Sequence, residues 1–335
     1  MNTMRSSIQQ YFREKLPHLA GGGRTDAAQD IYAARQLEYV YARTYDVVYP
    51  ELPMGEGQVV KFDPSVPRGA ETAVYYTIDA NGMAAILDTY DSASVPSVSM
   101  SGKQTVLVIK HQGLKYGYSV QDLEAASFAN TQLDSSLATA TKRGHVQRRD
   151  LIGWFGDAAR GLFGLMTYPN TTQTLAPLNI ALTSRLWADK TAQEILKDFA
   201  TLINTPRLLS LGAETVNVVY LPEQIVADLK ARYLNTANAS NQSIYQSIVD
   251  NFPGVSFKSA FQLDAAQHAS VSQFAGLNVA VAFNDNVDKI SFVVPIVFDQ
   301  MPPQYEGFMT NVYTRASTGG IKCPYPISVS ILLGF

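Results

Sequence analysis

The stretch between residues 58 and 115 constrains the fold most, because it is β-prone and yet cannot build a core alone. Short apolar, β-branched or aromatic pieces recur along it, separated by turn formers such as Asn81-Gly82. An Asn-Gly dipeptide between two such pieces is a strong short-range hairpin signal. We therefore expect Ala73 to Ile109 to form a long β-hairpin or meander. Large aliphatic residues are sparse between Asp88 and Gly102, so this part is expected to project and to lean on a partner.

The residues that follow predict one long helix. Ser119 and Asp122 have the spacing of an approximate capping pair, which favours a helix start at this point. A helical pattern of apolar residues, with some interruptions, then continues to about Phe155. A helix from Thr131 to Trp154 would be roughly 35 Å long. This exceeds the typical globular helix and indicates a structural spine.

The outer face of this helix is expected to carry a charged cluster. Its basic members could meet phosphates, but a solvated or intersubunit helix face is the favoured interpretation. The net charge of the chain is −3, so it lacks the basic field of a dedicated nucleic-acid-binding protein. A weak contact with packed DNA needs no motif and stays open. The cluster consists of Lys142, Arg143, Arg148, Arg149 and Asp150.

Residues from Thr171 to about Gln300 predict a second region of α/β character. Thr191 and Glu194 have capping-box spacing ahead of an apolar helical pattern. The C-terminal tail is β-prone again. The other expected elements are strands at Val216–Leu221, Val255–Phe261, Val279–Phe283 and Ile290–Phe298, a helix at Ile244–Asn251, and tail strands at Phe308–Tyr313 and Ile327–Leu333.

The sequence supplies no candidate catalytic, cofactor-binding or metal-binding residues. It contains no nucleophile elbow, no phosphate-binding loop and no zinc-protease motif. None of the histidines has a partner at ligand spacing, so each is expected to be a surface or packed residue. An enzyme of α/β type would need convergent polar residues in one pocket. The four histidines are His18, His111, His145 and His268.

Two further motifs favour structural interpretations. Cys323 is expected to be a buried, structural thiol. Asn284 to Asp288 resembles the start of a calcium loop, but Lys289 replaces the sharp-turn glycine and Pro295 replaces the bidentate glutamate. We therefore expect a plain Asn/Asp turn there.

Composition indicates a globular protein whose surface is covered in its working state. Hydrophobic residues make up 46% of the chain, and charged residues only 16%, against roughly 25% in ordinary soluble proteins. Self-association is the simplest way in which a surface with so few charged residues would be buried. The single cysteine excludes an intrachain disulfide. The first 19 residues lack a secretion signal, and the apolar runs are shorter than the about 20 residues of a membrane span, so a soluble protein made in the cytoplasm is expected.

The order of these pieces resembles the major capsid proteins of tailed double-stranded DNA bacteriophages, which have the Hong Kong 97-type fold. A loose N-terminal arm precedes a projecting hairpin, a long spine helix, a Gly-rich exit, an α/β region and a returning β tail. The resemblance covers about Ala27 to Phe335. The local strings that carry it are Pro67–Glu71, Gly117–Ser119, Gly161–Leu165 with Pro169-Asn170, Met301–Pro303, Arg315, Gly319-Gly320 and Pro324–Pro326.

The resemblance implies an α+β fold with five parts. Residues 1–56 would form an N-terminal arm and residues 57–113 an extended loop over a neighbouring subunit. Residues 114–170 would form a peripheral domain with the spine helix. Residues 171–300 would form the axial domain, and residues 301–335 the return strands of the peripheral domain.

The resemblance also implies a function. The chain would assemble with itself into hexamers and pentamers of an icosahedral shell around phage double-stranded DNA. Scaffolding, portal and decoration proteins would be further partners, and contact with packaged DNA would be non-specific. No catalytic, cofactor or metal site and no membrane is implied, and the location would be the virion after assembly in the host cytoplasm. An encapsulin-like nanocompartment shell is the alternative, and an α/β enzyme is less favoured.

Overall fold

A computed structural model describes residues 49–82, 97–128, 133–234, 242–268 and 274–335 of the chain. The chain divides into two units, Met1–Pro50 and Glu51–Phe335. Nearly all of the expected N-terminal arm therefore lies outside the described residues. The architecture that follows is that of the second unit.

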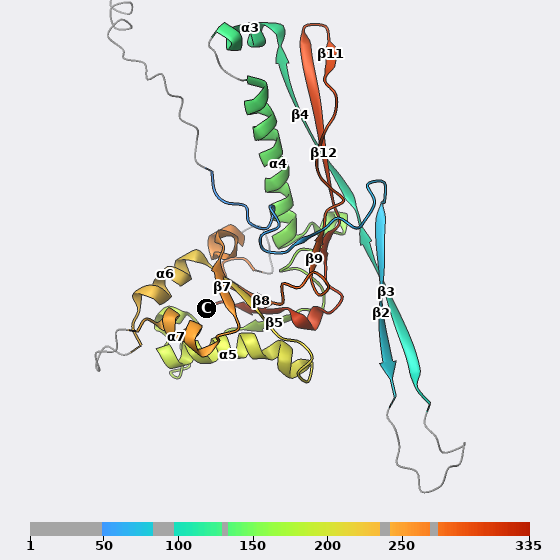
Figure 1. Cartoon of the computed structure of the whole chain (residues 1–335). Helices are drawn as coiled ribbons and strands as arrows, with labels where there is room; N and C mark the ends of the chain where they lie inside the picture. The colour runs from blue at the N-terminus through green and yellow to red at the C-terminus, as the bar shows by residue number, and fades with distance from the viewer. Residues whose placement is uncertain (1–48, 83–96, 129–132, 235–241, 269–273) are drawn as a thin grey trace, which may run out of the picture. The chain divides into compact units, whose positions relative to one another are not determined.

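The expected long hairpin is confirmed, but its turn is not where the sequence indicated. Strands β2 (Thr72–Asn81) and β3 (Ser99–Val108) pair antiparallel over their full length (Figure 1). Asn81 lies opposite Ser99, so residues 82–98 connect the strands and Asn81-Gly82 is not a two-residue turn.

The long helix is also confirmed, as α4 (Leu133–Phe155), preceded by the short helix α3 (Val120–Phe128). The expected cap is present, because Ser119 Oγ accepts from the backbone N–H of Asp122 while Asp122 Oδ2 accepts from the backbone N–H of Ser119. α4 lies alongside a ladder of long strands (Figure 1). In this ladder β12 (Met309–Thr318) pairs with β4 (Lys110–Ser119), β10 (Ile296–Gln300) and β11 (Gln304–Glu306).

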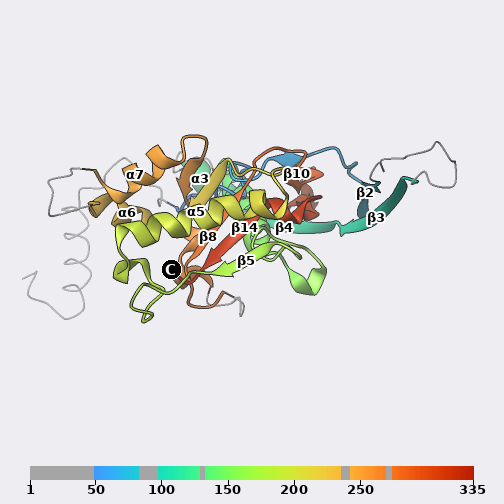
Figure 2. The same cartoon turned by 90° about the horizontal axis from the view of Figure 1, so that it is seen from below.

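The α/β region is built on a five-stranded sheet in the order β5-β14-β8-β6-β7. The two faces of this sheet pack against two separate hydrophobic clusters. Along β8, Val281 belongs to the cluster that contains Trp154 of α4, whereas the next residue, Ala282, belongs to the cluster that contains residues of α5, α6 and α7. Figure 2 shows α5 beside β8 and β14. The elements are β5 (Thr172–Leu175), α5 (Ala192–Leu209), β6 (Val218–Leu221), α6 (Glu223–Ala231), α7 (Ile244–Asn251), β7 (Ser256–Ser259), β8 (Val279–Phe283) and β14 (Ser330–Leu333).

The expected strand over Ile290–Phe298 is two strands. β9 (Ser291–Val293) forms a three-stranded sheet with β1 (Phe62–Asp63) and β13 (Gly320–Lys322), whereas β10 joins the β12 ladder. Pro295 lies between them, and a residue without a backbone N–H cannot continue a ladder. The described 3₁₀ helices are η2 (Ala158–Arg160), η3 (Trp187–Asp189), η4 (Phe261–Leu263), η5 (Ala265–His268) and η6 (Pro326–Ser328).

Three observations bear on the expected five-part division of the chain, which stays a prediction. β14, expected with residues 301–335 in the peripheral domain, is a central strand of the five-stranded sheet. β10, expected within 171–300, pairs with β12 instead. Met54, expected in the arm, is fully buried in the main hydrophobic cluster. These assignments depend on contacts between distant segments, which residue patterns do not encode.

The sheet position of β14 predicts that Leu332→Ala lowers the free energy of unfolding by about 2–5 kcal/mol, because Leu332 is fully buried against the helices. Leu175→Ala in the adjacent strand is the matched control. Leu175 is 55% exposed, so its truncation should cost no more than about 0.5 kcal/mol. Urea unfolding of the two variants measures the difference, and equal losses would contradict the assignment.

Candidate interaction surfaces and their anchors

The β2–β3 hairpin is an amphipathic ribbon with an uncovered apolar face. Cross-strand register puts Val74 opposite Val106 and Ala80 opposite Met100, so these residues share one face with Tyr76 and Ile78. Tyr76 and Ile78 are each 67% exposed and Met100 is 71% exposed. The opposite face is mostly polar and includes Thr77, Asp79, Ser101 and Lys103.

The base of the hairpin is anchored to the rest of its unit. There Leu107 is buried, and the hydroxyls of Tyr75 and Tyr168 lie 2.9 Å apart in a hydrogen bond. Burial, followed by this hydrogen bond, raises the pKa of Tyr168 well above its ordinary value. In Figures 1 and 2 the outer half stands clear of the other described elements of its unit. Every residue of β3 from Ser99 to Gln104 is exposed.

A buried carboxylate on α4 holds the segment that leads into the fold. Asp150 Oδ1 accepts from the backbone N–H groups of both Met54 and Gly55, each at 3.0 Å, and Asp150 Oδ2 accepts from Gln262 Nε2 at 3.1 Å. The approach is so close that a Cβ on Gly55 would collide with the backbone carbonyl of Val146. Burial raises the pKa of the Asp150 carboxyl to about 6, although the donated hydrogen bonds act in the opposite direction.

Arg149 completes this anchor from the neighbouring position on the helix. Its Nε donates to the carbonyl of Gly55 at 2.7 Å and its Nη1 to the carbonyl of Val297 at 2.9 Å. Its guanidinium also lies 5.1 Å from the ring centroid of Phe62. One side chain therefore ties α4 to the entering segment and to β10.

These contacts correct the expected outer face of the helix. Lys142 and Arg148 are exposed, as expected, but Arg149 is 3% exposed and Asp150 is 1% exposed. Asp150 lies four residues from both Val146 and Trp154, on the apolar side of the helix. That spacing is a signal by which the sequence could have placed it in the interior.

The other singled-out residues have structural roles. His145 is buried, with Nε2 hydrogen bonded to Thr314 Oγ1 at 2.9 Å, and burial lowers its pKa, with Arg149 contributing further. Cys323 is buried, as expected, and burial raises its pKa to about 11. The Asn284–Asp288 segment is a set of Asx turns, in which Asn284 Oδ1 accepts from the backbone N–H of Asn286, as expected.

Within the described ranges, no group of three or more His, Cys, Asp or Glu side chains is placed to hold a metal ion. None of the helices described is both long and apolar enough to cross a bilayer.

The pattern that sequence reasoning missed is the alternation of the hairpin. Val74, Tyr76 and Ile78 recur at every second position, which is the period of a one-sided strand. Among the described residues, the apolar face is carried by β2 and β3, and Met100 is the part of it that falls within the expected segment Asp88 to Gly102.

Comparison with known proteins gives one family match. The family model described as "Major capsid protein" matches residues 82–332. No curated protein sequence matches the chain.

Several solved structures resemble the chain over most of its length. The capsid of Myoviridae phage XM1 is 18% identical, with a TM-score of 0.74, and the match covers 90% of this chain and 98% of that one. The capsid of a native GTA particle is 10% identical, with a TM-score of 0.62 over 94% and 99% of the two chains. A structure from Mycobacterium phage Ogopogo is 12% identical, with a TM-score of 0.58 over 90% and 98%.

The Asp150 anchor predicts a specific pH dependence. The pKa of about 6 lies above the ordinary value of 3.8, so the folded chain takes up a proton between these values that the unfolded chain does not. This group therefore adds stability as the pH falls from 7 through 6, by about 1 kcal/mol at pH 5. Asp150→Asn cannot take up this proton, so its free energy of unfolding should not show this rise. Urea unfolding at pH 5 and pH 7 should therefore show that the wild type gains about 1 kcal/mol more than the variant on going to pH 5.

Asp150→Ala is the matched control, because it leaves the N–H groups of Met54 and Gly55 without their acceptor. It should cost about 1–3 kcal/mol at both pH values. Parallel stability profiles for the wild type and Asp150→Asn would contradict the assigned titration.

Proposed function

The chain belongs to the major capsid protein family and is a capsid shell protein, and from this premise we propose that it is the hexamer- and pentamer-forming subunit of an icosahedral shell that encloses phage double-stranded DNA. Its fold is the α+β, Hong Kong 97-type fold of the phage capsids it resembles.

The single observation that carries the proposal is the uncovered apolar face of the β2–β3 hairpin. A two-stranded ribbon has no interior in which to bury such a face. Burying one large apolar side chain stabilises by roughly 1.5–3 kcal/mol, and Tyr76, Ile78 and Met100 all remain open to solvent. A neighbouring copy of the chain supplies the cover.

The length of the hairpin favours a head-to-tail arrangement. Ten paired residues span about 34 Å, so the outer end contacts a different subunit from the one that anchors its base. Contacts between unlike patches of identical chains close into rings when the rotation fits. In this assignment the five-stranded sheet with α5, α6 and α7 is the axial domain, and α4 with the β12 ladder is the peripheral domain.

Exposed apolar residues at both ends of α5 support the axial assignment. Ile180 and Leu182, near its N-terminal end, are 84% and 74% exposed, and Leu211, just past its C-terminal end, is 96% exposed. Each would be covered by an adjacent axial domain in a ring.

The remaining parts of the proposal concern partners and location. The net charge of −3 suits a wall that encloses DNA with only non-specific contact. Scaffolding, portal and decoration proteins complete assembly, which takes place in the host cytoplasm and ends in the virion. The subunit performs no catalysis.

The experiment that tests the function compares two lysine substitutions on opposite faces of the hairpin. Ile78→Lys charges the apolar face, whereas Ser101→Lys places the same charge on the polar face, opposite Asp79. The wild type and Ser101→Lys should form shells of one diameter by electron microscopy, and Ile78→Lys should lower the shell yield at least tenfold.

Particle contents are analysed in the same preparations from phage-producing cells, where DNA is expected. A co-purifying enzyme in place of DNA would instead indicate a nanocompartment shell. Wild-type protein that stays monomeric in the presence of its scaffold would refute the proposed function.

A further inference from the structure

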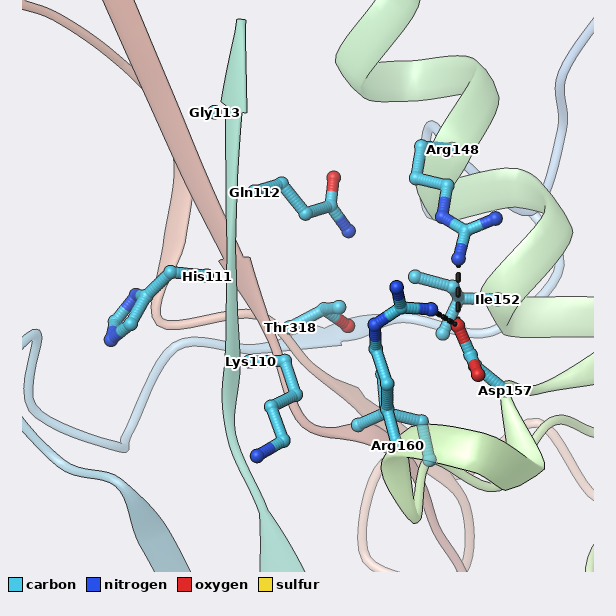
Figure 3. Close-up of a pocket in the computed structure, with 10 residues that line it drawn as sticks. Lys110, His111, Gln112, Gly113, Arg148, Ile152, Asp157, Arg160 and Thr318 are labelled. Atoms are coloured by element: carbon cyan, nitrogen blue, oxygen red, sulfur yellow. Dashed lines mark hydrogen bonds and ion pairs between the residues drawn. The ribbon is translucent and has the colours of Figure 1, made fainter.

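A basic cavity lies between the end of α4 and the start of β4. Its volume of about 550 Å³ falls within the roughly 300–1,000 Å³ that ligand pockets occupy. Three of the side chains that line it are cations from three different elements: Lys110 of β4, Arg148 of α4 and Arg160 of η2. Figure 3 shows the two arginines on the same side of β4 as the side chain of Lys110.

One carboxylate holds both arginines in place. Asp157 Oδ2 accepts from Arg148 Nη2 at 2.7 Å and from Arg160 Nη1 at 2.5 Å (Figure 3). Burial alone would raise the pKa of Asp157, but the hydrogen bond and the charge of Arg160, together with the charge of Arg148, hold this pKa below its ordinary value. Asp157 is therefore ionised at neutral pH and keeps the two guanidiniums beside each other.

The cavity keeps an excess of positive charge. The side chains of Arg148 and Arg160 remain 48% and 61% exposed although both pair with Asp157. Lys110 is exposed, and no ion pair in the described part of the chain includes it. Three cations with one carboxylate leave about two positive charges for an occupant.

The chemistry of the wall favours a phosphate over a peptide carboxylate. The charged groups open to an occupant are hydrogen-bond donors, because the side chain of Asp157 is only 11% exposed and is already bound by two guanidiniums. A backbone phosphate of a nucleic acid presents only acceptors, whereas a peptide also brings N–H groups that need acceptors of their own. The cavity therefore suits an anion without donors.

Buried apolar residues complete the lining and strengthen this preference for an anion. Ile152 and Leu162 line the same cavity and are 3% and 2% exposed. Apolar neighbours lower the local dielectric, which increases the attraction between a cation and an anion. The guanidiniums thus attract an anion more strongly here than on a fully solvated helix face.

We propose that this cavity is a phosphate-binding site, and that it takes a backbone phosphate of the enclosed double-stranded DNA. Guanidiniums match the geometry of phosphate oxygens. Duplex DNA carries one phosphate charge per about 1.7 Å of helix axis, so the site meets phosphates anywhere along it. Contacts to phosphate carry no sequence information, which suits a shell that encloses DNA of any sequence. The source of the phosphate rests on the proposed function.

The cavity also separates the basic residues of α4 into two groups. Arg148 lines it, whereas Lys142 of the same helix is exposed and lies outside the lining. Lys115 of β4 is likewise exposed and outside the lining. Lys115 and Lys142 therefore provide matched controls on the same two elements.

Amine labelling of DNA-filled and emptied shells tests the site. The empty shells are prepared from filled ones by release of the DNA, so the two particles differ in their DNA alone. In phosphate-free buffer, an acetylating reagent should modify Lys110 about tenfold more slowly in filled shells, as mass spectrometry measures. The labelling rates of Lys115 and Lys142 should change less than twofold between the two particles.

Inorganic phosphate added to emptied shells distinguishes the two sources of a phosphate group. Protection of Lys110 by inorganic phosphate, but not by the DNA of filled shells, overturns DNA as the source. Equally fast labelling of Lys110 in both particles overturns the site. Equally slow labelling in both assigns the cavity to a protein segment and also overturns it. Each of these results is obtained on intact shells and leaves the proposed function standing.

Two double variants of equal charge provide an independent readout. Lys110→Gln/Arg160→Gln removes the excess charge of the cavity and leaves the ion pair of Arg148 in place, whereas Lys115→Gln/Lys142→Gln removes two charges outside it. Unassembled subunits are titrated with a labelled DNA duplex at several salt concentrations. The cavity variant should bind about tenfold more weakly at about 50 mM salt, and its slope of log K against log salt should be shallower by about 0.9, the contribution of one phosphate contact. Equal affinities and slopes for the two double variants contradict the proposal.

Discussion

The main constraint on this subunit is that the two-stranded β2–β3 hairpin cannot bury its own apolar face. Among the described strands, β2 and β3 pair only with each other, and Tyr76, Ile78 and Met100 on the apolar face of the hairpin are exposed in a single subunit. A hairpin of this kind is marginal in water unless it packs against another surface. The base of the ribbon is anchored through Tyr75, Leu107 and Ile109, while β3 is exposed from Ser99 to Gln104.

The anchor on α4 joins several parts of the subunit through two buried side chains. Arg149 and Asp150 are adjacent on the helix, yet both point inward and engage the backbone of Met54 and Gly55. Removing either would leave buried polar groups without partners, which costs more than the hydrogen bonds themselves contribute. Charged side chains inside a helical spine thus connect the entering segment, the ladder and the α/β region into one frame.

Local features were readable from the sequence, and long-range ones were not. The capping box of Thr191 and Glu194, the helix Ile244–Asn251 and the strand Val279–Phe283 match the structure because neighbouring residues determine them. The hairpin register, the placement of β14 and the burial of Arg149 depend on segments far apart in the chain. For the same reason the sequence does not group Lys110, Arg148 and Arg160, which line one cavity only because β4 lies beside the end of α4.

The oxidation rate of Met100 tests the central claim most directly. Met100 lies on the apolar face and is 71% exposed in the subunit, so peroxide should oxidise it rapidly in free subunits. Met54 and Met166 are fully buried and should react slowly in free and assembled protein alike. Mass spectrometry of the two states should show Met100 protected at least tenfold in assembled shells. Equal oxidation rates of Met100 in shells and in free subunits would contradict the claim that another copy covers this face.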